Sequence, residues 1–202
     1  MTSIVFIIDD DASMRRSLSL LLDAHGYVVE TYSSAEEYLE RELHNDTGCL
    51  ILDVNLEGKS GMVLQEELKK LDQHLPIIFI TANGNVHMSV ETIRKGAINF
   101  LEKPFEEKEL MNSVSEAIQL SQKLKEQQDK SSMAKKLIDT LTPREIEILK
   151  YVITGLLNKQ TAGMLRIAEH TVQLHKLHIT NKLGVKSIPE MIAIARNAGI
   201  TP

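Results

Sequence analysis

The chain has 202 residues, 43% of them hydrophobic, and a formal net charge of -5. That hydrophobic share is enough to build real cores, and the length suits one large domain or two small ones. No apolar run approaches the roughly 18 residues of a membrane span, no signal peptide opens the chain, and the lone Cys49 excludes a disulfide framework within one chain. We therefore expect a cytoplasmic protein without a membrane partner, and a buried structural role for Cys49.

The charge is unevenly spread along the chain. Residues 1–120 hold 10 Lys and Arg against 21 Asp and Glu, whereas residues 141–202 hold 8 against 4. An acidic front part and a basic back part favour two domains with different partners, the basic one a candidate for binding a polyanion. Residues 121–140 are polar and lack Gly and Pro, which predicts a helical linker between the two domains.

Residues 4–120 alternate short apolar runs with segments of helical spacing. The apolar runs are IVFII, YVVETY, CLILD, PIIFIT and INFLEK, and segments such as SGMVLQEELKKL place Leu and Met at helical intervals. Strands that alternate with helices predict right-handed crossovers and a five-stranded, doubly wound parallel sheet, an α/β fold. The site of such a fold lies at the carboxyl ends of its strands.

The last third of the chain has the pattern of helices only. TPRE at residues 142–145 is a capping box with proline at the first helical position, which predicts the start of a helix. SIPE at residues 187–190 predicts a second helix start in the same way. Gly155 ends one helix, NKQTAGML predicts a short second helix, and EHTVQLHKLHITNKL predicts a longer third that ends at Gly184. Four short helices with a tight connection between the second and the third predict a compact helix-turn-helix domain.

Charged and hydroxyl side chains stand at the ends of four predicted strands. They are Asp9, Asp10, Asp11, Asp53, Thr81 and Lys103. Because these strand ends converge on one edge of the sheet, the side chains should share a pocket whose oxygens suit Mg²⁺, or Mn²⁺ in its place. A carboxylate there can accept a phosphoryl group, while the metal and Lys103 neutralise the developing charge and the Thr81 hydroxyl donates to a phosphoryl oxygen.

On these motifs, residues 1–120 resemble the receiver domain of two-component response regulators, and residues from about 140 resemble the LuxR-type DNA-binding domain. Together they resemble the FixJ/NarL arrangement. The receiver resemblance is carried by the acidic pair after the first strand, Asp53 after the third, a hydroxyl residue and Ala82 after the fourth, and KPF after the fifth. It implies a flavodoxin-like receiver and a sensor histidine kinase as the phosphoryl donor.

The resemblance also assigns roles to the receiver residues. It implies metal binding by Asp9, Asp10, Asp53 and the backbone carbonyl of Asn55, phosphoryl chemistry at Asp53, Thr81 and Lys103, and a switch formed by Thr81, Phe100 and a cis bond before Pro104. Phe100 has core packing as its alternative role, and Asp11 is left as a helix-starting residue. We hypothesise that Asn55 and Asn83 tune the attack of water on the acyl phosphate.

In the family pattern, NKQTAGML is the scaffold helix and EHTVQLHKLHITNKL is the recognition helix that lies in the major groove of double-stranded promoter DNA. The candidates for base-edge contact are Gln173, Leu174, Lys176 and Leu177. The candidates for phosphate contact are Lys159, Thr171, His175, Lys182 and Lys186. For Leu174 and Leu177, packing against the rest of the domain is an equal alternative.

The recognition helix departs from the family pattern at several positions. Ala168 replaces the usual capping Ser or Thr, and Gln173 and Leu177 stand at positions that are often basic. DNA binding by the monomer should therefore be weak and salt-sensitive, with affinity gained when a phosphorylated homodimer pairs two domains on a symmetric site. No Cys or carboxylate completes a ligand set with His170, His175 and His178, so we expect no metal there.

The sequence thus predicts a phosphorylation-controlled transcription regulator that is not an enzyme, beyond promoting its own phosphotransfer and dephosphorylation. One alternative is a phosphohydrolase with an aspartate nucleophile, which would need a second Asp two residues after the nucleophile, where this chain has Asn55. Another is an output domain that binds protein or RNA instead of DNA.

Overall fold

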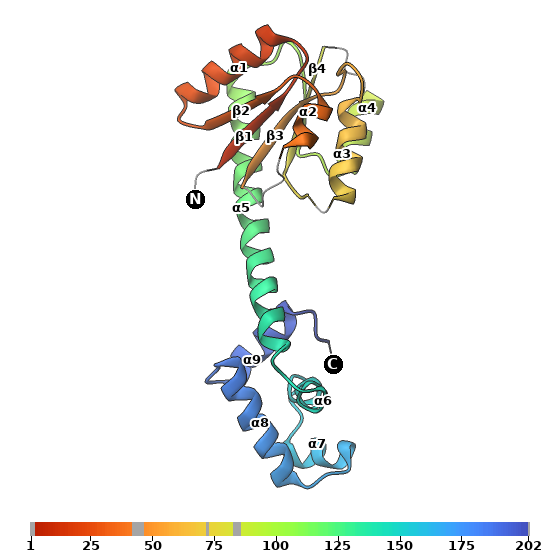
Figure 1. Cartoon of the computed structure of the whole chain (residues 1–202), viewed down its shortest axis with the longest axis vertical. Coiled ribbons are helices and arrows are strands. Elements are labelled where there is room, and N and C mark those ends of the chain that lie inside the picture. Colours follow the sequence, from red (N-terminus) through yellow and green to blue (C-terminus); the bar gives the residue numbers. More distant parts are fainter. Residues whose placement is uncertain (1–2, 42–46, 72, 83–85, 202) are drawn as a thin grey trace. The chain divides into compact units, whose positions relative to one another are not determined.

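The computed structural model describes residues 3–41, 47–71, 73–82 and 86–201, and the chain divides into two compact units, Met1–Lys125 and Glu126–Pro202 (Figure 1). Among the described helices, none combines the length and the hydropathy of a membrane span.

The first unit is built on a five-stranded parallel sheet in the order β2-β1-β3-β4-β5, which confirms the predicted fold. The strands are β1 (Ile4–Ile8), β2 (Val28–Tyr32), β3 (Gly48–Asp53), β4 (Ile77–Thr81) and β5 (Asn99–Glu102). All four strand pairings are parallel, so every strand ends at the same edge of the sheet.

Helices cover both faces of this sheet. They are α1 (Ala12–Ala24), α2 (Ala35–Glu40), α3 (Gly61–Lys70), α4 (Val86–Arg94) and the first part of α5 (Glu107–Ile138). Alternate strand residues such as Val5 and Ile7 pack in one core with residues of α1 and α5, while Phe6 and Ile8 pack in a second core with residues of α2 and α3. Cys49 is fully buried in the first core, as expected.

The second unit is helical. It contains the end of α5, then α6 (Pro143–Val152), α7 (Asn158–Leu165), α8 (Glu169–Leu183) and α9 (Ile188–Asn197), packed around a core of aliphatic side chains. Thr142 and Glu145 form the predicted capping box of α6. Ala168 gives α8 no side-chain capping bond. The predicted domain boundaries at residues 120 and 140 stay predictions, and α5 runs through the first of them without a break.

Candidate acidic site and helix-turn-helix surface

Three carboxylates meet at the carboxyl edge of the sheet. Asp53 is the last residue of β3 and Asp9 directly follows β1, and these strands pair in parallel register with Ile8 beside Leu52. Asp10 is exposed, whereas Asp9 is fully buried. One carboxylate oxygen from each of Asp9, Asp10 and Asp53 lies within 4.8 Å of the others, so the structure brings the three together as the sequence suggested.

Lys103, which directly follows β5, bridges two of these carboxylates. Its Nζ donates to Asp9 Oδ2 at 2.8 Å and to Asp53 Oδ2 at 2.6 Å. Burial raises the pKa of the Asp9 carboxyl above its ordinary value, even though the hydrogen bond from Lys103 opposes this. Burial also lowers the pKa of Lys103, but the hydrogen bonds to Asp53 and Asp9 outweigh it and raise that pKa overall, so the ammonium stays charged.

Two more predicted residues complete the polar network. The buried Thr81 hydroxyl accepts a hydrogen bond from Asn55 Nδ2 at 3.0 Å, and the Asn55 backbone N–H donates to Asp53 Oδ1 at 2.9 Å. The Lys103 backbone N–H donates to the Thr81 carbonyl at 2.8 Å, and the Lys103–Pro104 bond is cis, as the resemblance implied. Asn55 thus links Thr81 to the carboxylates, because its side chain contacts Thr81 and its backbone N–H contacts Asp53.

The remaining receiver predictions concern Phe100, Asp11 and Asn83. Phe100 of β5 is half-buried and packs against the core that contains Phe79, so its switch role stays a prediction. Asp11 accepts hydrogen bonds from the backbone N–H groups of Ser13 and Met14, which confirms it as the residue that starts α1. Asn83 lies outside the described residues.

The donor set fits a divalent cation. Three carboxyl groups lie close together with one ammonium between two of them, and like charges this close repel unless a cation lies among them. Carboxylate oxygens are hard ligands, and the exposed Asp10 leaves an open side for water. Mg²⁺ has this preference for oxygen and water.

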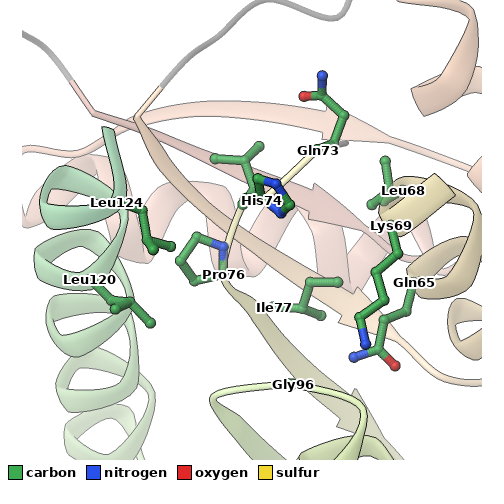
Figure 2. Close-up of a pocket in the computed structure, with 11 residues that line it drawn as sticks. Gln65, Leu68, Lys69, Gln73, His74, Pro76, Ile77, Gly96, Leu120 and Leu124 are labelled. Carbon is green, nitrogen blue, oxygen red and sulfur yellow. The ribbon is translucent and has the colours of Figure 1, made fainter. Parts of the chain in front are cut away.

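The first unit also has a pocket that is separate from this site. A pocket of about 300 Å³ lies near the amino end of β4 and is lined by side chains from α3 and α5 (Figure 2). Ile77, Leu120 and Leu124 contribute apolar side chains to its lining, and the buried Gln65 Oε1 has no hydrogen-bond partner among the described residues. Thr81 lies at the opposite end of β4, so the pocket takes no part in the acidic site.

The predicted recognition helix is α8, preceded by α7 as the scaffold helix. Gln173 is exposed, as are Leu174 and Leu177, whose exposed fractions are 49% and 55%. The packing alternative for the two leucines therefore finds little support, because side chains packed in a core would be largely buried. Lys159 and Lys186 are also exposed.

Several other predicted DNA contacts already have partners within the second unit. Lys176 Nζ donates to Asn158 Oδ1 at 3.0 Å, and Lys182 Nζ donates to Glu145 Oε2 at 2.7 Å. Thr171 and His175 are half-buried. Phosphate binding by Lys182 stays a prediction, and it would require the ion pair with Glu145 to open.

Glu145 has the capping role that the sequence predicted and further contacts that it did not predict. It closes the capping box of α6, yet it is also buried, and the hydrogen bond from Lys182 holds the pKa of its carboxyl at about 2. Glu145, His175 and His178 each offer one ligand atom within 4.8 Å of the others. The prediction that no carboxylate lies with these histidines is therefore wrong for His175 and His178, because packing brings Glu145 to them from a helix distant in sequence, whereas His170 is not part of the group.

A doubly wound sheet with a lysine-bridged acidic cluster, followed by a helix-turn-helix unit, defines the class of phosphorylation-controlled response regulators. Comparisons with known proteins agree. Residues 5–115 match the response regulator receiver domain, and residues 139–195 match the bacterial regulatory proteins of the luxR family.

Individual relatives cover nearly the whole chain. Nodulation protein W of Bradyrhizobium diazoefficiens is 42% identical over 199 residues, which are 98% of this chain and 88% of that protein. Transcriptional regulatory protein FixJ of Azorhizobium caulinodans is 35% identical over 98% of this chain and 94% of its own length. Among solved structures, the response regulator StyR is 39% identical and superimposes with a TM-score of 0.84, covering 97% of this chain and 99% of that one.

This chain therefore belongs to the two-component response regulators in which a receiver domain is followed by a LuxR-type DNA-binding domain. A receiver domain implies a histidine kinase partner, and a LuxR-type domain implies DNA binding. The family is one of transcription regulators and not typically of enzymes, which leaves the phosphohydrolase alternative without support.

Proposed function

We propose that Asp53 accepts a phosphoryl group from a sensor histidine kinase and that this modification controls binding of the second unit to promoter DNA. The observation that carries the proposal is the Lys103 ammonium, which lies within hydrogen-bond distance of both Asp9 and Asp53. Because Lys103 already contacts acidic side chains at the ends of two strands, it can also bind a third anion at the same place, the phosphoryl group.

In this proposal, Asp9, Asp10, Asp53 and the carbonyl of Asn55 hold Mg²⁺ or Mn²⁺. When bound, the ion supplies positive charge beside the phosphoryl oxygens. An Asp53 carboxylate oxygen forms the new O–P bond as the N–P bond of the kinase phosphohistidine breaks. Lys103 moves its hydrogen bonds from the carboxylates to the phosphoryl oxygens.

Thr81 transmits the change. Its hydroxyl, which now accepts from Asn55 Nδ2, turns to donate to a phosphoryl oxygen. That movement at the end of β4 biases the rotamer of the half-buried Phe100 on the neighbouring β5 and so remodels the surface near both strands. The altered surface favours a homodimer, in which two DNA-binding domains act together. Slow self-dephosphorylation, tuned by Asn55, resets the switch.

On DNA, α8 lies in the major groove. Base edges are contacted by Gln173 and, through apolar contacts to thymine methyl groups, by Leu174 and Leu177, with Lys176 reaching bases when it leaves Asn158. The phosphates are contacted by Lys159, Thr171, His175, Lys182 and Lys186. We place the protein in the cytoplasm because both of its partners, the kinase phosphohistidine and promoter DNA, are reached there.

Phosphorylation is tested with acetyl phosphate and Mg²⁺ on the full chain, read by phosphate-affinity gel and intact mass. Wild type should gain one phosphoryl group and Asp53→Asn none. Asp11→Asn is the matched control, because it alters a neighbouring carboxylate whose capping role Asn can also fill, and it should be phosphorylated like wild type. Uptake by Asp53→Asn at the same rate as wild type would overturn the assignment.

DNA binding is tested by selecting fragments from a genomic library with phosphorylated protein and titrating them in gel shifts. Phosphorylated wild type should bind more tightly than Asp53→Asn, with an affinity that falls steeply as salt rises. Equal affinity of the two proteins for the selected fragments would contradict phosphorylation control.

A further inference from the structure

A second group of metal-ligating side chains lies in the helix-turn-helix unit. His175 and His178 are three residues apart on α8 and so lie on one face of that helix. Glu145 lies in the first turn of α6. One ligand atom from each of the three residues lies within 4.8 Å of the other two.

The polar atoms of this group are not all satisfied. His175 Nδ1 is buried and has no hydrogen-bond partner among the residues that the structure describes. An imidazole nitrogen that is withdrawn from water without a partner is unfavourable, and metal ligation is one of the ways to satisfy it. This observation is independent of the distances among the three side chains.

Glu145 is well placed to be the third ligand. Its Oε2 accepts hydrogen bonds from Lys182 Nζ at 2.7 Å, from the Thr142 N–H at 2.8 Å and from the Thr142 hydroxyl at 3.0 Å. All three bonds end on the same oxygen, and among the described residues no hydrogen bond to Oε1 is found. The two Thr142 contacts also hold the carboxylate in one orientation, as supporting hydrogen bonds do in metal sites.

We propose that Glu145, His175 and His178 bind one Zn²⁺ ion, with water as the fourth ligand. Two imidazole nitrogens and one carboxylate oxygen form a donor set that zinc accepts with tetrahedral geometry. Ligand atoms around a tetrahedral zinc ion lie about 3.3 Å apart, given bonds of about 2.0 Å. The site therefore closes by a small movement, for which His178 is free because it is exposed.

The ion would link α6 to α8, the helix that carries the proposed DNA contacts. Binding is opposed by the ammonium of Lys182, which lies against the same carboxylate. Removal of this positive charge should therefore tighten zinc binding. The site needs no residue of the receiver unit, so it is independent of phosphorylation.

The test is a Zn²⁺ titration of the full chain in excess Mg²⁺, followed by the imidazole NMR signals of the individual histidines. The signals of His175 and His178 should shift together, and that of His170 should stay unchanged. Each histidine gives its own NMR signal, so zinc bound at the receiver carboxylates does not change the signals of His175 and His178. Asp53→Asn should give the same titration of His175 and His178 as wild type.

Matched variants distinguish a zinc site formed by all three side chains from zinc binding by two neighbouring histidines alone. His178→Ala and Glu145→Gln should weaken binding by about tenfold or more, and the latter retains a residue that suits the capping box. His170→Ala, on the same helix but outside the group, should bind as wild type does. Lys182→Gln should bind more tightly than wild type.

The proposal is overturned if the His175 and His178 signals do not move in excess zinc. It is equally overturned if Glu145→Gln binds zinc as wild type does, if His170→Ala weakens binding as much as His178→Ala, or if Lys182→Gln fails to tighten it. Circular dichroism of each variant establishes that its helices are intact, so that a lost signal reports a lost ligand.

Discussion

Replacing Lys103 by Met should destabilise the first unit by about 3 kcal/mol at neutral pH. The ammonium lies 2.8 Å from Asp9 Oδ2 and 2.6 Å from Asp53 Oδ2, and the two carboxylate side chains are only 0% and 9% exposed. At an effective dielectric constant of about 20, each contact is worth about 6 kcal/mol of attraction before desolvation. Desolvation of the three groups cancels most of this sum, but removing Lys103 leaves two buried carboxylates that repel each other. Asp9 can take up a proton, which places the loss at the lower end of the range of about 3–5 kcal/mol for a broken buried pair.

The matched control is Lys95→Met. Lys95 also contacts two carboxylates, Glu66 at 2.7 Å and Glu91 at 2.8 Å, but it does so on the surface of the same unit. Because water screens exposed ion pairs, this change should cost several-fold less than Lys103→Met. The two variants therefore lose the same number of contacts of nearly the same length and differ mainly in burial.

The measurement is urea unfolding of the full chain without added metal, followed by tyrosine fluorescence. Three of the four tyrosines, Tyr27, Tyr32 and Tyr38, lie in the first unit, so this signal chiefly reports its unfolding. With a slope of roughly 1.5 kcal/mol per molar urea, a loss of about 3 kcal/mol lowers the midpoint by about 2 M. Equal midpoints for Lys103→Met and Lys95→Met would refute the reasoning, because burial would then add nothing to the lysine contacts.

Three further variants, one of them with a matched control, test other parts of the structure. The pKa of the Glu145 carboxyl is held at about 2, below its ordinary value of 4.5. Its ionised form therefore stabilises the second unit fully above pH 4.5, and this contribution is lost as the pH falls towards 2. The difference in stability between wild type and Glu145→Gln, measured by circular dichroism, should be full at pH 7 and close near pH 2. Ala168→Ser should supply the missing cap of α8 and add about 1 kcal/mol, seen as a rise of about 5 °C in the melting temperature of this unit. Gly61→Ala places a Cβ 2.3 Å from the Asp53 carbonyl oxygen and should slow phosphorylation by acetyl phosphate, whereas Gly163→Ala, which meets nothing within 4 Å, should leave the rate unchanged.

The acidic site could be predicted from the sequence because a parallel sheet fixes where its strands end. Once the apolar runs before Asp9, Asp53 and Lys103 are recognised as parallel strands, the pairing of β1 with β3 brings residues 44 positions apart into one pocket. The sequence did not reveal the hydrogen bond from Asn55 to Thr81, because a side-chain rotamer, and not the strand register, decides which partner an amide finds.

Helix packing explains why the second unit was less predictable. The 3.6-residue period and the capping box located α6 and α8, but they do not determine how two helices cross or which side chains meet between them. Lys182 was predicted as a phosphate contact from its place on the recognition helix, yet packing brings it to Glu145, 37 residues away. The same packing brings His175 and His178 to that carboxylate. Because Glu145 was assigned to a local capping motif, its long-range contacts had no signal in the sequence, and the only site of this unit with metal-ligating chemistry among the described residues emerged from the tertiary structure. It follows that a substitution at Glu145 should affect α8 as well as the start of α6, whereas a substitution at Thr142 should act mainly on the cap.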